Sequence, residues 1–144
     1  MHKVSRIIIH HSATSDTTSL SWAAIRHYHT KVKGWEDIGY HAGCELTVVG
    51  YECLYGRPLD MTGAHTLGEN DTALGFCFVG NYDIRKPGLS MLEAAAYRVL
   101  APWVRQFNLH PRDIRPHREF SSKTCPGELF DMDLLRGLVD AALS

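Results

Sequence analysis

The stretch Arg6-Ile7-Ile8-Ile9-His10-His11 decides the fold. Its run of β-branched residues predicts a buried strand, and the histidines that follow place imidazoles at the carboxyl end of that strand. A second unbroken apolar run, Ala73 to Val79, predicts another central strand. Helical segments separate the strands along the chain, so we expect an α/β fold with a mixed central sheet flanked by helices.

Three helices are expected around this sheet. The first spans roughly residues 20–33, with Thr18 or Ser19 as its cap and Gly34 after its end. The second begins at Ser90-Met91-Leu92-Glu93, which has the spacing of a capping box, and runs to about Asn108. Asp131 or Asp133 opens the third.

Two further strand segments complete the expected sheet. Residues 40–55 contain two strand-like runs around Gly50 and predict a hairpin, and Ile114 lies in a short strand. If the hairpin turns near Val48-Val49, Cys44 and Cys53 face each other across the strands. Because the sequence carries no export signal, we expect thiols there rather than a disulfide.

The composition excludes several classes of protein. The 144 residues carry 15 Lys and Arg against 16 Asp and Glu, which excludes a nucleic-acid binder that works by bulk positive charge. No apolar run approaches the ~18 residues of a membrane span, and the first ten residues lack the features of a secretory signal peptide. We expect cytoplasmic synthesis, no membrane insertion, a monomer, and one domain over residues 3–143.

Histidine is unusually frequent, with nine residues, whereas the four cysteines at 44, 53, 77 and 125 form no C-x-x-C pair. That spacing is not typical of a disulfide framework or a zinc ribbon. A bound metal would therefore take most of its ligands from histidine.

His117 and Cys125 are the first candidate ligands. They lie eight positions apart in a loop-like segment, which can bring an imidazole and a thiolate to one zinc ion at ~2.0 and ~2.3 Å. Lys123 precedes the cysteine by two residues, where its ammonium would lower the pKa of the thiol and aim a donor at whatever the metal polarises. This spacing alone favours the simpler alternative of a buried cysteine and a solvated histidine.

One of His10 and His11 would complete the ligand set. Side chains alternate along a strand, so only one of the two can face a given site, and open α/β sheets keep their crevices at the carboxyl ends of strands. Two histidines and one cysteine leave a fourth position open on zinc, which is the catalytic pattern. Taken alone, both histidines are better explained as ordinary strand-end residues.

Tyr40 and His65 are weaker candidates. A phenol beside a metal can hydrogen-bond a water or an oxyanion, although a half-buried strand tyrosine is the simpler interpretation; His65 either lines the pocket or is exposed. His27, His29 and Trp35 are better assigned to helix packing and termination. No G-x-S-x-G or phosphate-binding glycine motif is present, and Cys125 lacks the context of a cysteine protease.

Together these segments resemble the zinc-dependent N-acetylmuramoyl-L-alanine amidases of the amidase-2 type, the group that includes bacteriophage T7 lysozyme and the peptidoglycan-recognition proteins. No single motif is decisive, but the ordered set is specific and covers residues 6 to about 130. The matching stretches are Ile8 to Thr14, Gly34-Trp35, Asp37 to His41, Gly56 to Asp60, Gly63 to His65, Leu74 to Gly80, His117 to Glu119 and Lys123 to Gly127.

The resemblance implies zinc held by His10, His117 and Cys125, with Tyr40 and Lys123 as catalytic residues. The bond hydrolysed would be the amide between N-acetylmuramic acid and L-alanine, with Lys123 stabilising the oxyanion and Tyr40 orienting water or assisting proton transfer. Which of the two acts as acid or base stays open. His65, Trp35 and Asn70 are the expected substrate-binding residues, and His11 is expected to be structural.

The biological role has several candidates. The leading one is a phage or prophage endolysin that acts on the cell wall after release through a holin-type route, with no separate wall-binding domain. A non-catalytic peptidoglycan-binding module is the alternative from another class, but recognition-only members of this fold commonly lack the ligand cysteine that this chain keeps at Cys125. A secreted antibacterial toxin or a muropeptide-recycling enzyme would use the same chemistry.

Overall fold

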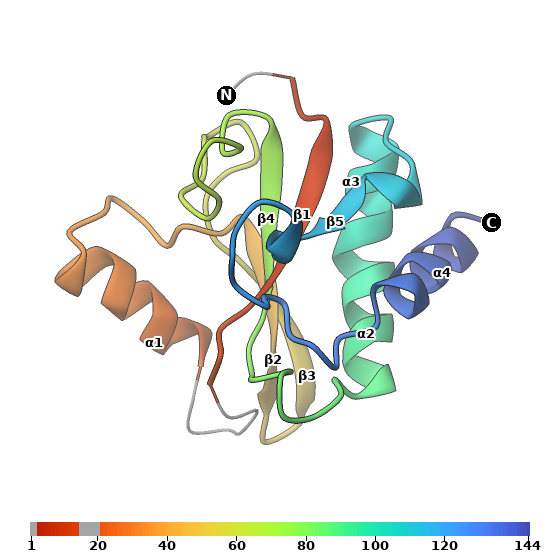
Figure 1. The fold of residues 1–144 in the computed structure, drawn as a ribbon, viewed down its shortest axis with the longest axis horizontal. Helices are drawn as coiled ribbons and strands as arrows, with labels where there is room; N and C mark the ends of the chain where they lie inside the picture. The colour runs from red at the N-terminus through yellow and green to blue at the C-terminus, as the bar shows by residue number, and fades with distance from the viewer. Residues whose placement is uncertain (1–2, 15–20) are drawn as a thin grey trace.

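A computed structural model describes residues 3–14 and 21–144 of the chain (Figure 1). Thr18 and Ser19, the expected caps of the first helix, lie outside the described residues. That helix begins instead after Ser21, whose hydroxyl accepts a hydrogen bond from the backbone N–H of Ala24. Its cap thus lies two residues beyond Ser19 and three beyond Thr18.

Five strands form one mixed sheet in the order β3-β2-β4-β1-β5. Strand β1 runs parallel to β4 and β5, and β2 runs parallel to β4 but antiparallel to β3. The expected α/β fold with a mixed sheet is confirmed, including both apolar strands and the hairpin. The bounds are β1 Arg6–His11, β2 Ala42–Thr47, β3 Gly50–Tyr55, β4 Ala73–Phe78 and β5 Ile114–Pro116.

Helices cover both faces of the sheet, as Figure 1 shows. On one face lies α1 (Trp22–His27), which continues into a π-helical turn, η1 (Tyr28–Val32). On the other face lie α4 (Met132–Leu143) and one long helix made of α2 (Leu89–Ala95), η2 (Ala96–Leu100) and α3 (Ala101–Gln106). Two 3-10 turns, η3 (Pro111–Asp113) and η4 (His117–Glu119), flank β5. None of the helices in the described part of the chain has the length and apolar character needed to span a membrane.

The central strands divide their side chains between these two faces, because successive residues of a strand point in opposite directions. Ile7 and Ile9 of β1 join Phe76 of β4 in the main core, under the long helix and α4. Cys77 belongs to the smaller cluster on the α1 face. His10 follows Ile9, so its side chain also points to the α1 face, where the groove described below lies.

The expected capping box at Ser90 is wrong. The N-cap is Gly88, two residues earlier than Ser90; it has extended backbone conformation, and no side chain caps this end of the helix. Ser90 therefore lies inside the first turn, whereas a capping hydroxyl must come from the residue just before the helix. The third helix does begin as expected, because the Asp131 side chain accepts from the backbone N–H of Leu134.

The hairpin turns at the expected place. Thr47 pairs with Gly50, so Val48 and Val49 form the turn, and Cys44 pairs with Cys53 across the strands. No disulfide joins these two cysteines. The hairpin register expected from the sequence is confirmed.

Candidate metal centre

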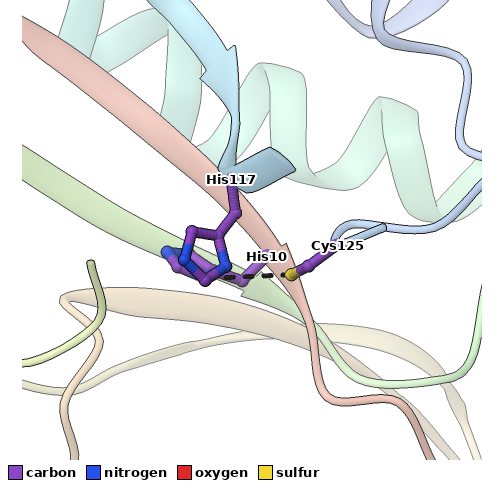
Figure 2. Close-up of side chains that lie close together, drawn as sticks. All are labelled: His10, His117 and Cys125. Atoms are coloured by element: carbon purple, nitrogen blue, oxygen red, sulfur yellow. Dashed lines mark hydrogen bonds between the residues drawn. The ribbon is translucent and has the colours of Figure 1, made fainter. Parts of the chain in front are cut away.

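His10, His117 and Cys125 converge at the carboxyl end of β1 (Figure 2). Their candidate ligand atoms all lie within 4.8 Å of one another. The ring centroids of His10 and His117 are 4.4 Å apart, and His10 Nδ1 lies 3.9 Å from Cys125 Sγ. The structure therefore brings together three residues that come from β1, from η4 and from the loop after η4.

The loop from His117 to Cys125 is closed by its own backbone. The N–H of Arg118 donates to the carbonyl of Cys125 at 2.7 Å, which holds the two ends of the loop together. Asp83 fastens the loop from outside, because its carboxylate accepts from the Thr124 hydroxyl at 3.0 Å and from the backbone N–H of Glu128 at 2.9 Å. Asp83 was not singled out from the sequence. Its position just beyond β4, at the same sheet edge as the end of β1, is the signal that could have found it.

His11 supports the centre without entering it. Its backbone N–H donates to Cys125 Sγ at 3.3 Å, and its Nδ1 accepts from the backbone N–H of Tyr82 at 3.1 Å. Strand alternation thus sends His10 to the centre and uses His11 to hold the neighbouring segments. These contacts agree with the structural role expected for His11.

The donor set fits zinc. Two imidazoles and one thiol are typical zinc ligands, and their spacing can accommodate one ion at ~2.0–2.3 Å from each donor atom. His117 Nδ1 is buried and has no hydrogen-bond partner among the described residues. A buried nitrogen without a partner is costly, and coordination to a metal would satisfy it.

Burial favours the neutral form of both imidazoles. It lowers the pKa of His10 well below its ordinary value, with further contributions from His65 and His117, and it lowers the pKa of His117, with a further contribution from the Lys123 ammonium. Neutral imidazole is the form that binds metals. Both histidines are therefore ready to act as ligands at neutral pH.

The Lys123 ammonium acts on the pKa of Cys125 in the expected direction, but burial has the larger effect. Burial raises the pKa of the Cys125 thiol to about 11, although the N–H of His11 and the Lys123 ammonium both act in the opposite direction. The lysine exerts the expected influence, but loss of hydration outweighs it. A cation at the centre is what would deprotonate the sulfur.

A groove of about 650 Å³ opens over the centre, and Tyr40 and Lys123 both line it. The Tyr40 ring lies 5.1 Å from the ring of His10. Burial, together with Cys77 and Cys125, raises the pKa of Tyr40 well above its ordinary value, so its hydroxyl keeps its proton and can donate a hydrogen bond. Lys123 is exposed, with its side chain at the groove.

Cys77 is a further neighbour that sequence reasoning missed. It pairs with His10 in the β1–β4 register and forms a hydrogen bond with the Tyr40 side chain. Its position as the fifth residue of a buried apolar strand carried no sign of this contact. Only the pairing of the strands places it beside Tyr40.

The three residues expected to bind substrate have different surroundings. Trp35 lines the groove and packs against His29, with 4.7 Å between ring centroids. His65 also lines the groove, but its Nε2 lies 3.1 Å from the Ala73 carbonyl and its Nδ1 faces His10. The structure does not bring Asn70 to the groove lining. Instead, its Oδ1 accepts from the backbone N–H groups of residues 65 and 66, both at 2.9 Å, and shapes the turn after His65.

Comparison with known proteins identifies relatives of the chain. The profile of the N-acetylmuramoyl-L-alanine amidase family, amidase-2, matches residues 1–128. An N-acetylmuramoyl-L-alanine amidase of Mus musculus is 34% identical over 137 residues, which cover 88% of this chain and 25% of that protein. Peptidoglycan recognition protein 1 of Bos indicus is 31% identical over 105 residues, covering 72% of this chain and 54% of that protein. The matched region thus spans about half, or less, of the length of these relatives.

Two solved structures resemble this fold. N-acetylmuramoyl-L-alanine amidase LysC from Clostridium intestinale superposes with a TM-score of 0.78 at 23% identity, covering 96% of this chain and 86% of that one. A complex of tracheal cytotoxin with the ectodomains of peptidoglycan recognition proteins LCa and LCx gives a TM-score of 0.75 at 29% identity, with coverages of 89% and 78%.

Proposed function

The chain belongs to the N-acetylmuramoyl-L-alanine amidase family, and from this premise we propose that it is a zinc-dependent peptidoglycan amidase. The bond cleaved is the amide between N-acetylmuramic acid and the L-alanine of the stem peptide. The observation that carries the proposal is the convergence of the His10, His117 and Cys125 ligand atoms within 4.8 Å beside a groove.

His10, His117 and Cys125 would hold the zinc, and a set of three protein ligands leaves a fourth position open. Zinc bound there would supply a Lewis acid that polarises the scissile carbonyl and lowers the pKa of a water toward ~7. The protein contributes the fixed geometry, since β1 and the closed loop place the three donors before any substrate arrives.

Lys123 and Tyr40 act on the reacting groups from the groove. The Lys123 ammonium stabilises the negative charge that develops on the carbonyl oxygen as the amide becomes tetrahedral. The Tyr40 hydroxyl, which burial keeps protonated, donates a hydrogen bond that orients the attacking water or assists proton transfer to the leaving amine. Trp35 forms part of the groove that receives the substrate.

The names of the relatives support a substrate class. The mouse relative is named for the amide that it hydrolyses, the bovine relative for peptidoglycan recognition, and one structural neighbour holds tracheal cytotoxin. These names support peptidoglycan or a muropeptide as the partner of this groove. We propose that residues 3–143 form the catalytic domain and that the protein lyses the cell wall, as a phage or prophage endolysin does.

A peptidoglycan-binding module without catalysis is the second candidate, because several relatives are named as recognition proteins. The presence of Cys125 with both histidine ligands supports catalysis over recognition alone. The two candidates differ in one product, the stem peptide released with a free L-alanine amino group.

Digestion of purified Gram-negative sacculi tests the proposal. The zinc-loaded protein, the same protein after chelation, and the chelated protein with zinc restored are incubated with sacculi, and the products are identified by mass spectrometry. We expect free stem peptides in the first and third samples only. Equal release after complete removal of zinc would refute the metal mechanism, and binding to sacculi without peptide release would identify a recognition module.

A further inference from the structure

We propose that His65 is a positioning residue for the metal centre: it holds His10 in the tautomer whose Nδ1 lone pair faces Cys125, and thereby selects Nδ1 as the ligand atom. This inference rests on the proposed zinc site and adds a residue that orients one of its ligands. A short series of hydrogen bonds runs from a backbone carbonyl through His65 to the centre.

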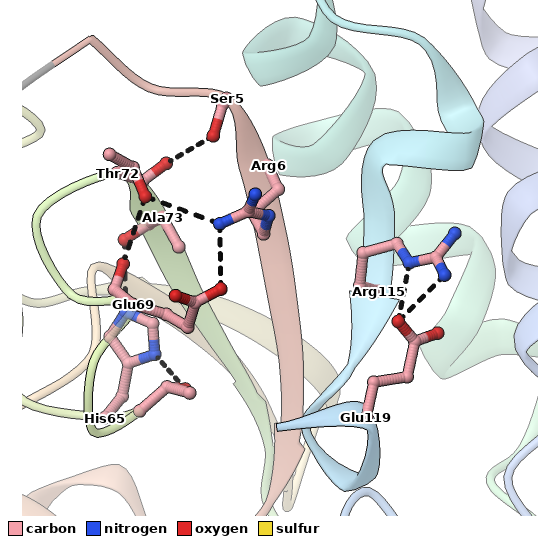
Figure 3. Close-up of polar contacts among 9 residues, drawn as sticks. Ser5, Arg6, His65, Glu69, Thr72, Ala73, Arg115 and Glu119 are labelled. Carbon is pink, nitrogen blue, oxygen red and sulfur yellow. Dashed lines mark hydrogen bonds and ion pairs between the residues drawn. The ribbon is translucent and has the colours of Figure 1, made fainter.

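This series of hydrogen bonds begins at Ala73, the first residue of β4. Its carbonyl oxygen lies 3.1 Å from His65 Nε2, a contact drawn in Figure 3. A carbonyl oxygen can only accept, so Nε2 carries the hydrogen. The partners of the two ring nitrogens among the described residues are a carbonyl, a hydroxyl and an imidazole, and none of them is an anion that would stabilise a charged ring. The ring is therefore neutral and has a single N–H. The other nitrogen of His65, Nδ1, therefore presents a lone pair.

The next link joins His65 to the ligand. His65 Nδ1 lies 3.0 Å from His10 Nε2. Two lone pairs at this distance would repel each other, so His10 Nε2 carries a hydrogen and points it at His65. The remaining nitrogen of His10, Nδ1, is then unprotonated, and this is the atom that lies 3.9 Å from Cys125 Sγ.

The buried hydroxyl of Thr66 completes a triangle with these two rings. Its oxygen lies 2.9 Å from His65 Nδ1 and 3.3 Å from His10 Nε2. The hydroxyl can donate to His65 while it accepts from His10, so it leaves the hydrogen on His10 Nε2. Ligand histidines commonly donate their second ring N–H in this way, which fixes both the tautomer and the orientation of the ring.

Two glycines hold the His65 ring in place. A Cβ added at Gly75 of β4 would lie 2.6 Å from Cγ and Cδ2 of His65, and one added at Gly63 would lie 2.8 Å from Cδ2. Both distances are shorter than real Cβ contacts, so the imidazole lies directly against the backbone at two points. The ring therefore cannot move toward Gly75 of β4 or toward Gly63 without a clash.

The loop that carries His65 is also tied to the strand that carries His10. Arg6 of β1 forms an ion pair with Glu69 at 2.9 Å and a hydrogen bond with the Thr72 hydroxyl at 3.4 Å (Figure 3). The backbone N–H of Ser5 donates to the Thr72 carbonyl at 2.9 Å. The separation between the two imidazoles is therefore set by contacts on both sides of the pair.

Zinc affinity gives the first test. His65→Leu removes the acceptor while retaining an apolar side chain, and His65→Asn returns an amide oxygen near the position of Nδ1. His27→Leu, at an exposed histidine on α1, is the matched control. Zinc dissociation constants are measured by competition with a chromophoric chelator on proteins whose circular dichroism matches the parent. We expect the leucine variant to bind zinc about 10–100-fold more weakly, the asparagine variant to recover most of this loss, and the control to match the parent.

The tautomer of His10 gives a second and independent test. Long-range ¹H–¹⁵N spectra of the parent should place the hydrogen of His10 on Nε2, both without zinc and with zinc bound. A hydrogen on Nδ1, or zinc affinity in the leucine variant within twofold of the parent, would overturn the inference. If the leucine variant does not fold, the parent spectrum and the asparagine variant decide the matter. Loss of zinc binding or of cleavage in the parent would instead count against the proposed function, because the zinc-free spectrum requires neither.

Discussion

Replacing Lys123 with alanine separates charge stabilisation from metal binding, because this lysine lies in the ligand loop without being a ligand. Loss of one donor to an oxyanion typically lowers kcat by about 10²–10³-fold. Lys123 is exposed at the groove, so water screens its charge, and we expect a loss near the lower limit. The expected decrease in kcat is about 100-fold, or ~2.7 kcal/mol of transition-state stabilisation.

Zinc binding should change much less than kcat. The Lys123 ammonium lowers the pKa of both His117 and Cys125, which favours their metal-binding forms, but its positive charge also repels a cation. Because these two effects oppose each other, its removal should leave the zinc dissociation constant close to that of the parent. The changes in kcat and in zinc binding together distinguish an oxyanion-stabilising residue from one that merely maintains the site.

The assay measures the release of amino groups from sacculi under steady-state conditions, with zinc content determined for each protein sample. Lys123→Arg keeps the charge and should keep most of the activity, and Lys86→Ala removes an exposed lysine ahead of α2 as a control. An alanine variant with the kcat of the parent would refute the oxyanion role. Loss of zinc in proportion to the loss of activity would show that the lysine supports the metal instead.

Three further predictions concern the surroundings of the centre. Cys125→Ala should lose zinc and peptide release together while circular dichroism stays unchanged, and metal analysis with the sacculus assay checks this; a zinc-replete, active variant would exclude the sulfur as a ligand. Hydrogen bonds from the backbone N–H of Glu128 and the Thr124 hydroxyl lower the pKa of Asp83. The stability that its carboxylate contributes is therefore complete above about pH 3.9, the ordinary aspartate pKa, and is lost as the pH falls through the lowered pKa. Asp83→Asn should therefore be less stable than the parent at pH 7, with a difference in unfolding free energy that shrinks below about pH 4 in urea titrations; a difference independent of pH would contradict this. Gly75→Ala should cost ~1–3 kcal/mol of stability and weaken zinc binding, because the added Cβ would overlap the imidazole behind His10; an unchanged zinc dissociation constant would show that the ring position is unimportant.

Local patterns in the sequence were sufficient to predict the strands of the central sheet. The apolar runs at 6–10 and 73–79 predicted the central strands, because a buried strand needs an unbroken series of apolar residues and the two runs supply it. The hairpin and its Cys44–Cys53 pairing followed from two strand-like segments around one turn. The resemblance then identified His10, His117 and Cys125 as a set, which no spacing within the chain could have done.

The helix start at Gly88 shows where local patterns fail. Ser90 has the residue spacing of a capping box, but the helix begins at Leu89, so Gly88 is the N-cap and Ser90 is already the second helical residue. Capping depends on which residue has extended backbone conformation, and the path of the incoming loop decides that.

The surroundings of the metal centre belong to the tertiary structure alone. His65 meets His10 across 55 positions of sequence, and Asp83 meets Thr124 across 41. Composition and periodicity report on residues a few positions apart, whereas these hydrogen bonds arise only in the folded chain. The loop that carries His65 packs against Gly75 of β4, and the segment after β4 meets the loop that carries Cys125. The sequence therefore determined the strands and, through the resemblance, the candidate ligand residues, and the folded chain decided which groups lie beside them.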